Sequence, residues 1–402
     1  MSKALQRFLK YASIDTTSKE GADKTPSTQG QWTLAGLLRD EMVEMGVRQV
    51  SLDENCYLYG LVPGNTEDQP VIALLAHLDT ADAVPGRMFK PQVRRFTGEE
   101  LLLNAELGIK LSLNDFPTLM HQIGKELVVT DGTTVLGSDD KAGIAEIMTA
   151  AEHLIKHSEI MHGDVWLVFT PDEEIGSGAD LLKLDLIKAD FGYTLDGGAL
   201  HEIEYENFNA ASAHLHFKGR NVHPGYAKGK MLNALKLAMA YQGLLPGDET
   251  PEKTEGHEGF FHLRKLSGEE ENAEMDYLIR EHDSEKFESR KALMQKAAET
   301  LNAKYGEGAV TLIIKDSYRN MKEIIMKYPG VLERAEKAIR ACGMQPANVP
   351  IRGGTDGARL SFRGLPCPNL GTGGENWHSV YEFLPVDALE KMADVIVEII
   401  RA

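Results

Sequence analysis

The chain has 402 residues, of which 42% are hydrophobic and 26% charged, a composition typical of a globular protein rather than a disordered or fibrous one. At this length a single hydrophobic core usually stops growing, so two domains are expected. The formal net charge of -18 argues against a nucleic-acid partner, because phosphate backbones need a basic protein face. No apolar segment approaches the roughly 18 residues of a membrane span, so no membrane partner is expected.

The cysteines indicate the compartment. Cys56, Cys342 and Cys367 are scattered singly and form no CxxC pair. This pattern favours reduced thiols over a disulfide framework or a thiolate zinc cluster. We therefore expect a cytoplasmic protein.

Helical and extended patterns alternate through the first half of the chain, which predicts a mainly parallel sheet with helices on both faces. The N-terminus reads as an amphipathic helix. A second helix is expected over 31–45, with extended segments near 48–52 and 56–62. The run 71–76 is continuously apolar, as is typical of a strand buried on both faces. Further strands are expected at the apolar runs 134–136, 165–169 and 191–195, and a long helix over 142–157.

The pattern changes near residue 208. Apolar and polar residues alternate in 213–217, 259–263 and 275–280, a further strand is expected at 310–314, and helical stretches cover 231–243 and 284–303. This order predicts an inserted α+β lid domain, 208–318, with an antiparallel sheet. The α/β pattern then returns and ends on a helix over 385–401, so 1–207 and 319–402 form the predicted α/β domain, which carries the candidate site described next.

Acidic residues or a histidine follow each apolar run of the first half. They are His77 and Asp79, Asp139 and Asp140, Glu173 and Glu174, and Asp196. Taken singly, each acid is more often a helix cap or a turn residue. Ligands of open α/β sheets bind beyond the carboxyl ends of the strands, so these segments should meet at one edge. That many like charges would repel strongly without cations, and we predict a metal centre there.

These segments resemble the zinc-site motifs of the M20 metallopeptidases. The motifs are His-Leu-Asp at 77–79, Gly-Ser-Asp-Asp-Lys at 137–141, Asp-Glu-Glu at 172–174 and Asp-Gly-Gly at 196–198, with Gly-Gly-Glu-Asn-Trp-His at 373–378 similar to the last ligand segment. The resemblance spans essentially the whole chain. Within the family it is strongest to the tripeptide aminopeptidases, through 204–211, 221–225 and 351–357. Ala142 after Lys141 departs from the glycine of the wider family pattern, without affecting the ligand.

The resemblance implies two zinc ions per chain, although the sequence does not separate zinc from cobalt or manganese. Asp139 would bridge the two ions. His77 and Asp196 would bind one ion, and Glu174 and His378 the other. Imidazole nitrogen and carboxylate oxygen are ordinary zinc ligands in sites that keep a position open for water.

The same resemblance implies roles for two further acids. Glu173 would be the general base, and Asp79 would orient His77 without touching metal. Residues two apart in an extended segment share a face, so Asp79 can reach the outer nitrogen of His77. The peptide bond 139–140 is expected to be cis, as in relatives of this family.

Substrate recognition is predicted in the inserted domain and just beyond it. His223 is the candidate donor to the substrate oxyanion, although an isolated His-Pro-Gly is more often only a turn. Arg280 and Arg352 are weaker candidates for binding the substrate carboxylate. The predicted function is a dizinc aminopeptidase acting on tripeptides with a free N-terminus, in a chain that could form a homodimer. The zinc motifs leave open a dipeptidase, a carboxypeptidase or an N-acyl amino acid hydrolase. A non-catalytic peptide-binding or metal-sensing relative is disfavoured, because Glu173 and all five ligands are present.

Overall fold

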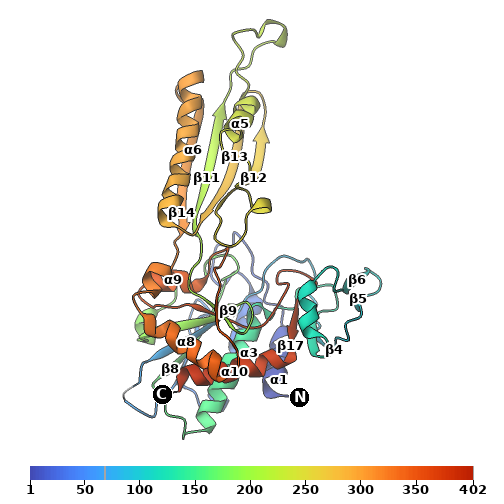
Figure 1. The fold of residues 1–402 in the computed structure, drawn as a ribbon, viewed down its shortest axis with the longest axis vertical. Coiled ribbons are helices and arrows are strands. Elements are labelled where there is room, and N and C mark those ends of the chain that lie inside the picture. The colour runs from blue at the N-terminus through green and yellow to red at the C-terminus, as the bar shows by residue number, and fades with distance from the viewer. Residues whose placement is uncertain (68, 402) are drawn as a thin grey trace. The chain divides into compact units, whose positions relative to one another are not determined.

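The chain divides into two compact units in a computed structural model that describes residues 1–67 and 69–401. Unit 1 comprises Met1–Tyr205, Glu323–Val349 and Thr355–Ala402, and unit 2 comprises Glu206–Lys322 and Pro350–Gly354. Figure 1 shows the ribbon, with many of the helices and strands labelled. Within the described residues, no helix is both long and apolar enough to cross a membrane.

Unit 1 is built on an eight-stranded sheet in the order β1-β2-β8-β3-β9-β16-β10-β15. Its centre is β3 (Ile72–His77), which runs parallel to β8 (Val165–Thr170) and β9 (Phe191–Gly197). The other strands are β1 (Arg48–Leu52), β2 (Leu58–Val62), β10 (Glu202–Glu204), β15 (Ala347–Asn348) and β16 (Asn369–Gly371). Antiparallel pairing is confined to β1 with β2, β2 with β8 and β10 with β16, so the sheet is mainly parallel.

Helices cover both faces of this sheet. Every residue of β3 is buried, with Leu74 and Ala76 in one apolar cluster and Ala73 and Leu75 in another. The first cluster draws on α1 (Lys3–Ala12), α2 (Gln29–Met45), α3 (Ser138–Lys156), α8 (Pro329–Ala341) and α10 (Val386–Ile400), and the second on α4 (Leu184–Ile187) and α9 (Asp356–Phe362). The predicted α/β fold is confirmed.

The predicted strand 134–136 is wrong. These residues form an irregular loop that leads into α3. The N–H groups of Leu136 and Gly137 donate to the carboxylate of Glu382 instead of to a neighbouring strand. Gly137 has a φ of 76°, a left-handed conformation that glycine adopts without steric cost and that ends an extended run.

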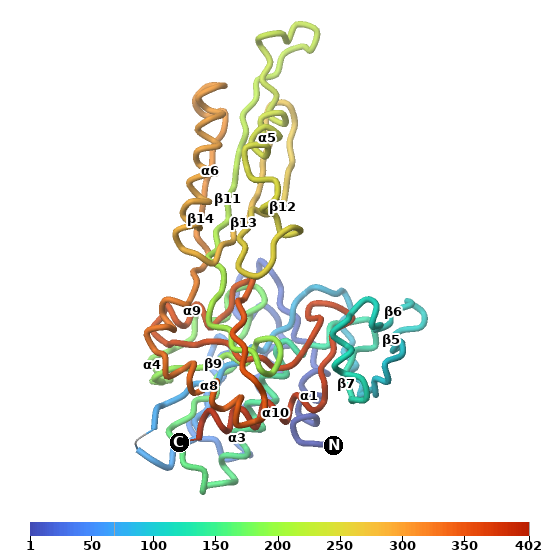
Figure 2. Tube along the Cα trace, viewed as in Figure 1, coloured from blue at the N-terminus to red at the C-terminus, as the bar shows by residue number. Residues whose placement is uncertain are grey.

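The segment between β3 and α3 forms short strands that the sequence pattern does not predict. They are β4 (Gln92–Arg95), β5 (Leu101–Asn104), β6 (Ile109–Leu111) and β7 (Glu126–Val129), with the 3-10 helix η1 (Pro117–Gln122). The β5–β6 hairpin forms a separate sheet, and β7 lies between β4 and β17 (Phe383–Pro385) in a three-stranded sheet. Figure 2 shows the trace of β5, β6 and β7 in this region. Phe96, Leu119 and Phe383 share a small apolar cluster in this region.

Unit 2 contains a four-stranded antiparallel sheet in the order β12-β13-β11-β14, as predicted for the inserted domain. The strands are β11 (Asn209–Lys218), β12 (Phe260–Gly268), β13 (Asn272–Glu281) and β14 (Val310–Tyr318), and the main helices are α5 (Ala234–Gln242) and α6 (Ser284–Tyr305). The short 3-10 helices η2 (Pro224–Tyr226) and η3 (Pro251–Lys253) lie before and after α5, and the short helix α7 (Lys322–Ile325) begins at the last residue of the stretch 206–322. Leu215 and Phe217 of β11 are buried in the same cluster as Tyr241 of α5 and Met294 of α6. The helices therefore cover one face of the sheet.

The segment Pro350–Gly354 belongs to unit 2, although the sequence pattern places it in the catalytic domain. The backbone of Ile351 pairs with Glu206 and Asn207 of unit 2, and further contacts come from the guanidinium of Arg352. It donates to the carbonyl oxygens of Gly256, Glu258 and Thr254 and lies over the rings of Phe208 and Phe260. These contacts tie the segment to a loop of unit 2.

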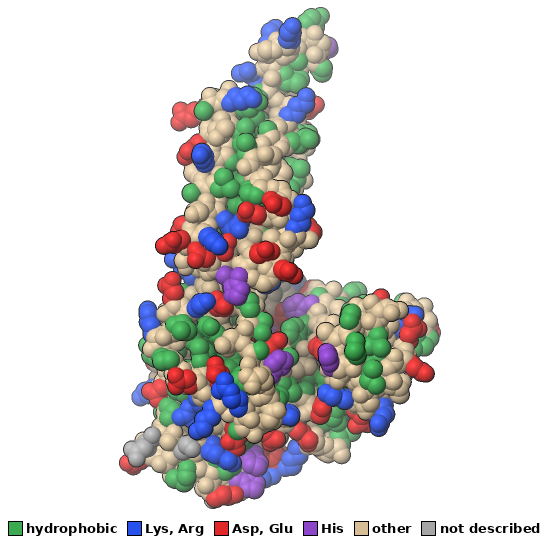
Figure 3. All heavy atoms as spheres, viewed as in Figure 1, with side chains coloured by type: hydrophobic (Ala, Val, Ile, Leu, Met, Phe, Trp, Pro, Cys, Tyr) green, Lys and Arg blue, Asp and Glu red, His purple; other side chains and the backbone are tan. Residues whose placement is uncertain are grey.

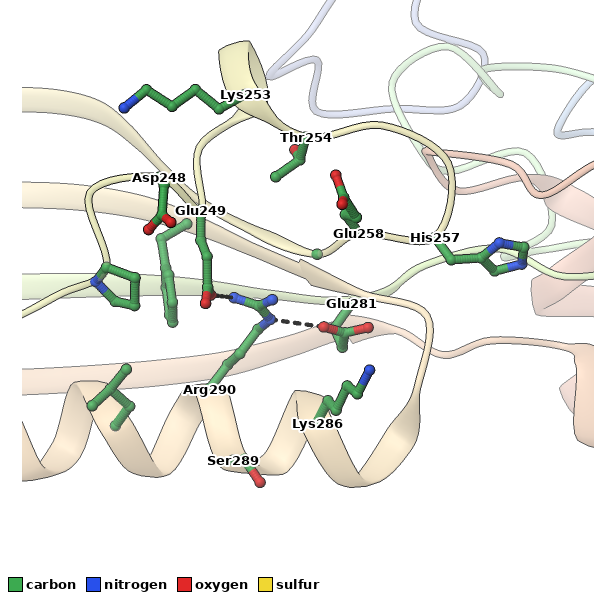
Figure 4. Close-up of a pocket in the computed structure, with 14 residues that line it drawn as sticks. Asp248, Glu249, Lys253, Thr254, His257, Glu258, Glu281, Lys286, Ser289 and Arg290 are labelled. Atoms are coloured by element: carbon green, nitrogen blue, oxygen red, sulfur yellow. Dashed lines mark hydrogen bonds and ion pairs between the residues drawn. The ribbon is translucent and has the colours of Figure 1, made fainter.

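A cavity of about 900 Å³ lies beside this loop within unit 2. Figure 4 shows Arg290 of α6 between Glu249 and Glu281, with which it forms ion pairs. The guanidinium also lies over the ring of Phe261. None of the predicted metal ligands lines this cavity, so the candidate centre is elsewhere.

Candidate metal centre

The predicted ligands gather at the carboxyl ends of the parallel strands of unit 1. His77 is the last residue of β3, Asp196 lies near the end of β9, and the turn after β8 carries Glu174. Asp139 lies at the start of α3. Adjacent parallel strands end side by side, and this brings together side chains that are far apart in the sequence.

One group of possible metal ligands consists of His77, Asp139 and Asp196, each offering one atom within 4.8 Å of the others. Nε2 of His77 lies 2.8 Å from Oδ1 of Asp139 and 3.5 Å from Oδ1 of Asp196. The His77 side chain is only 2% exposed. This group is therefore one buried imidazole with two partly buried carboxylates.

A second group consists of Asp139, Glu174 and His378. Nε2 of His378 lies 3.0 Å from Oδ2 of Asp139 and 3.0 Å from Oε2 of Glu174. Asp139 therefore directs one oxygen to each group, which is the placement expected of a bridging ligand. The peptide bond between Asp139 and Asp140 is cis, as predicted.

The donor atoms fit a transition-metal ion such as zinc, which binds imidazole nitrogen and carboxylate oxygen. Oε1 of Glu174 is buried and has no hydrogen-bond partner among the described residues. A buried polar oxygen without a partner costs free energy. A cation between Glu174, Asp139 and His378 would supply the missing interaction.

Burial and neighbouring charges shift the pKa values of the proposed ligands. Burial raises the pKa of Asp196 to about 6, and burial together with the charge of Asp139 raises that of Glu174 to about 7. Burial alone would also raise the pKa of Asp139, but hydrogen bonds from His378 and His77 outweigh it and lower that pKa. Hydrogen bonds to Asp139 and Glu174 raise the pKa of His378 to about 11. A metal ion would compete with these protons, because ligands bind it deprotonated.

Asp79 links the end of β3 to the turn after β8. Nδ1 of His77, the outer nitrogen of that ring, lies 3.1 Å from the backbone carbonyl oxygen of Asp79 and 3.3 Å from its Oδ1. The Asp79 carboxylate also accepts the backbone N–H groups of Glu173 at 3.0 Å and Glu174 at 3.1 Å. The first contact is the predicted one, and the second was not predicted. Asp79 thus holds three residues of the candidate centre in place.

Glu173 lies beside the two donor groups but belongs to neither of them. Burial and the charges of Asp196 and Asp356 raise the pKa of Glu173 well above its usual range. Asp356, at the start of α9, is itself buried and accepts a hydrogen bond from the hydroxyl of Thr170. Glu173 is therefore a carboxyl that takes up a proton readily at this edge of the sheet.

The turn that carries Glu173 and Glu174 is fixed by its first acid. Asp172 has a φ of 59°, which is uncommon for a residue other than glycine. Its carboxylate accepts hydrogen bonds from the backbone and hydroxyl of Ser27 and from the side chain of Gln31. Sequence reasoning did not identify this role, because Ser27 and Gln31 lie more than a hundred positions away.

Glu382 is the second residue that sequence reasoning missed. Its buried carboxylate accepts the N–H groups of Leu136, Gly137 and Ser138 in the loop that leads to Asp139. No sequence pattern identifies it, because it lies outside the ligand motifs and its partners are about 245 positions away.

The three predicted substrate residues all belong to unit 2. His223 is exposed, and its Nδ1 accepts the N–H of Gly225 in a tight turn. Arg280 uses one terminal nitrogen on backbone carbonyls of its own sheet and lies over the ring of Tyr318. Arg352 uses both terminal nitrogens on the loop described above.

Comparison with known proteins identifies the family. Residues 205–309 match the peptidase dimerisation domain of the M20 family. The chain is 52% identical over 403 residues to peptidase T of Clostridium novyi, covering 100% of this chain and 99% of that protein. It is 51% identical to peptidase T of Caldanaerobacter subterraneus, again over 100% of this chain and 98% of the relative.

Solved structures agree with these matches. The crystal structure of aminopeptidase PepT from Bacillus cereus superposes with a TM-score of 0.79 at 25% identity, covering 99% of this chain and 97% of that one. Agreement at this level extends over both units of the chain. The chain belongs to the peptidase T family of the M20 metallopeptidases.

Proposed function

We propose that this protein is an aminopeptidase that removes the N-terminal residue from tripeptides at a centre of two zinc ions. The observation that carries the proposal is the pair of donor groups that share Asp139. Membership of the peptidase T family supports the substrate class, and the name of the Bacillus cereus relative supports aminopeptidase activity.

The residues present divide naturally between two ions. His77 and Asp196 would hold the first, Glu174 and His378 the second, and Asp139 both. When bound, two such ions polarise a carbonyl group and lower the pKa of a bound water toward 7. The imidazole of His77 is kept in orientation by Asp79, whose carboxylate lies against its outer nitrogen.

Glu173 is the proposed general base. It would take the proton of the attacking water and deliver it to the departing amine. Its raised pKa suits this exchange, since a raised pKa makes the carboxylate a stronger base toward water, and the proton it gains can then pass to the departing amine. The carboxylate of Asp79 accepts the backbone N–H groups of Glu173 and Glu174. These hydrogen bonds would hold the proposed base, Glu173, at a fixed position relative to the proposed ligand, Glu174.

For the substrate, we propose His223 as an oxygen-binding donor and Arg280 as the residue that binds the terminal carboxylate. Nε2 of His223 has no protein hydrogen bond among the described residues, and one terminal nitrogen of Arg280 is similarly uncommitted. Arg352 is committed to the loop of unit 2 through both terminal nitrogens, which favours a structural role for it.

A substrate panel tests the proposed activity. Purified enzyme loaded with zinc would be offered di-, tri- and tetrapeptides, each with a free and an acetylated N-terminus. We expect rapid release of the first residue from tripeptides with a free amino group, and little cleavage of acetylated peptides. Equal rates on long peptides would contradict the tripeptide specificity, and preferred release of the last residue would contradict the aminopeptidase assignment.

The match of residues 205–309 to a peptidase dimerisation domain supports a homodimer. Light scattering coupled to size-exclusion chromatography would give a mass near twice the 44.3 kDa of one chain. A mass of one chain at micromolar concentration would contradict the dimer.

A further inference from the structure

We propose that Glu382 is a positioning residue that fixes Asp139 relative to His378 and thereby sets the metal affinity of the second donor group. The inference rests on the proposed metal centre. Glu382 belongs to neither donor group, so its effect would pass through the backbone that carries the ligands.

The carboxylate of Glu382 collects five hydrogen bonds from the four residues 136–139. Oε2 accepts the N–H groups of Leu136 at 2.6 Å and Gly137 at 3.0 Å. Oε1 accepts the N–H of Ser138 at 2.7 Å, its hydroxyl at 2.5 Å, and the N–H of Asp139 at 3.3 Å. Consecutive amides directed at one carboxylate fix the local path of the chain up to and including the bridging residue.

The place of this carboxylate is also favourable. Residues 136–139 precede the regular turns of α3, because Asp139 and Asp140 have non-helical backbone angles, so their buried N–H groups need an acceptor from elsewhere in the chain. Glu382 is only 1% exposed, so water does not compete for these donors. The segment that leads to the ligand Asp139 is thus held by an acid from a distant part of the chain.

The segment on the other side carries His378. Two backbone hydrogen bonds between Glu375 and Phe383 close it into a loop, with N···O distances of 3.0 and 3.1 Å. Inside the loop, the hydroxyl of Ser379 donates to the carbonyl of Asn376 at 2.7 Å. Glu382 stands beside the closing bridge, four positions after His378. The loop that carries His378 is therefore closed directly beside Glu382, whose carboxylate binds the segment 136–139.

A second contact joins the same two segments. A Cβ atom added to Gly374 would lie 2.7 Å from the hydroxyl oxygen of Ser138, too close for a real side chain. The backbone at Gly374 therefore packs directly on the segment that precedes Asp139. This contact and the Glu382 carboxylate both restrict how far the two segments can move apart. They therefore help to maintain the distance of 3.0 Å between Nε2 of His378 and Oδ2 of Asp139.

Replacing the carboxylate by an amide of the same shape should disturb this arrangement. In Glu382→Gln the new NH₂ group would face N–H donors, so some of the five contacts would become donor against donor. Residues that orient metal ligands typically change metal affinity by 10- to 100-fold when they are altered. We expect a loss of this size at one of the two metal sites.

The experiment compares apo-enzyme of the wild type, Glu382→Gln and Glu146→Gln in zinc titrations against a chromophoric chelator. Glu146 is a matched control, a buried carboxyl of α3 that has no partner for either oxygen among the described residues. We expect wild type and Glu146→Gln each to bind two ions, and the affinity for each ion to be the same in the two proteins. Glu382→Gln should bind at least one ion tenfold or more weakly, and binding of both with wild-type affinity would overturn the proposal.

Thermal unfolding with and without zinc separates positioning from a general loss of stability. A purely structural residue would lower Tm equally in both states, whereas Glu382→Gln should also shrink the rise in Tm that zinc produces. Glu382→Asp, which keeps the charge but shortens the reach, provides the same comparison if the amide variant does not fold. An unchanged rise in Tm in the variant that folds would overturn the inference. A wild type that binds fewer than two ions would instead refute the proposed metal centre.

Discussion

Asp139 offers one carboxylate oxygen to each donor group, Oδ1 toward His77 and Oδ2 toward His378. Removing that side chain takes a ligand from both proposed metal positions at once. We expect Asp139→Ala to lose at least one of the two ions, as measured by elemental analysis after gel filtration. Asp394→Ala, which alters an exposed acid of α10, is the control and should keep both. A fully active wild type with one ion per chain would contradict this prediction.

Glu173 and Glu174 are neighbours with different expected roles. Only Glu174 belongs to a donor group, and Glu173 is the raised-pKa carboxyl beside it. Glu173→Ala should therefore retain both ions while kcat falls by a factor of roughly 10² or more, because general acid–base catalysis contributes on that scale. Metal content and kcat would be measured on the same preparation. If the variant loses metal, the roles of the two glutamates are reversed.

The proposed ligands were accessible from the sequence because most follow apolar strands whose ends must meet. His77 and Asp196 stand at strand ends in both the pattern and the structure. Asp172 and Glu382 were not accessible, since their hydrogen-bond partners depend on how distant segments pack. The ligand set was thus predicted from local pattern and resemblance, whereas the residues that support it required the fold.

At the level of elements, the long and strongly patterned segments were predicted well. The runs 165–169 and 191–195 became β8 and β9, and the helix expected over 284–303 became α6. The strands of three or four residues between β3 and α3 escaped prediction, because so short a segment carries little periodicity. They are stabilised by a local cluster that includes Phe96 and Leu111.

Helix α3 contains a buried carboxyl that makes stability depend on pH. Both oxygens of Glu146 lack partners among the described residues, and burial raises the pKa of this group well above its usual value. Between the usual pKa of about 4.3 and the raised one, the folded chain holds a proton that the unfolded chain has lost. The contribution of Glu146 to the free energy of unfolding therefore falls by about 1.4 kcal/mol per pH unit as the pH rises from the usual pKa to the raised one.

Glu146→Gln should remove this dependence. The difference in Tm between the variant and the wild type is expected to shift in favour of the variant when the pH is raised from 5 to 8. The reason is that the amide stays neutral at both pH values. Thermal unfolding of the two apo-proteins in matched buffers would show the difference. Parallel Tm curves from pH 5 to pH 8 would mean that Glu146 ionises without cost in the folded state.

For the whole molecule, a net charge of -18 means that binding of a negatively charged substrate end would require a local positive charge. Lys and Arg side chains are interspersed with Asp and Glu on the visible face (Figure 3). Arg280 is the proposed reader of the substrate carboxylate, and a charge-assisted contact of this kind contributes about 1.5–3 kcal/mol. Arg280→Ala should lower kcat/KM on Ala-Ala-Ala by about tenfold to a hundredfold, with a much smaller effect on the C-terminal amide.

Arg352→Ala is the matched control for this measurement. Its guanidinium binds the 254–258 loop, so the variant should lose stability and affect the peptide and its amide to a similar extent. If Arg280→Ala also fails to discriminate between the two substrates, Arg280 does not read the carboxylate. If Arg352→Ala discriminates, the roles of the two arginines are exchanged.

Unit 2 is made from two stretches of chain, Glu206–Lys322 and Pro350–Gly354. The short stretch is small, but Arg352 within it supplies four hydrogen bonds to the loop at 254–258. The inserted unit is consequently not contained in one continuous stretch of the chain. A fragment consisting only of residues 206–322 would lack Arg352, and the loop at 254–258 would lose these four hydrogen bonds. Transplanting the unit onto another scaffold would require both stretches, joined by a new linker in place of residues 323–349.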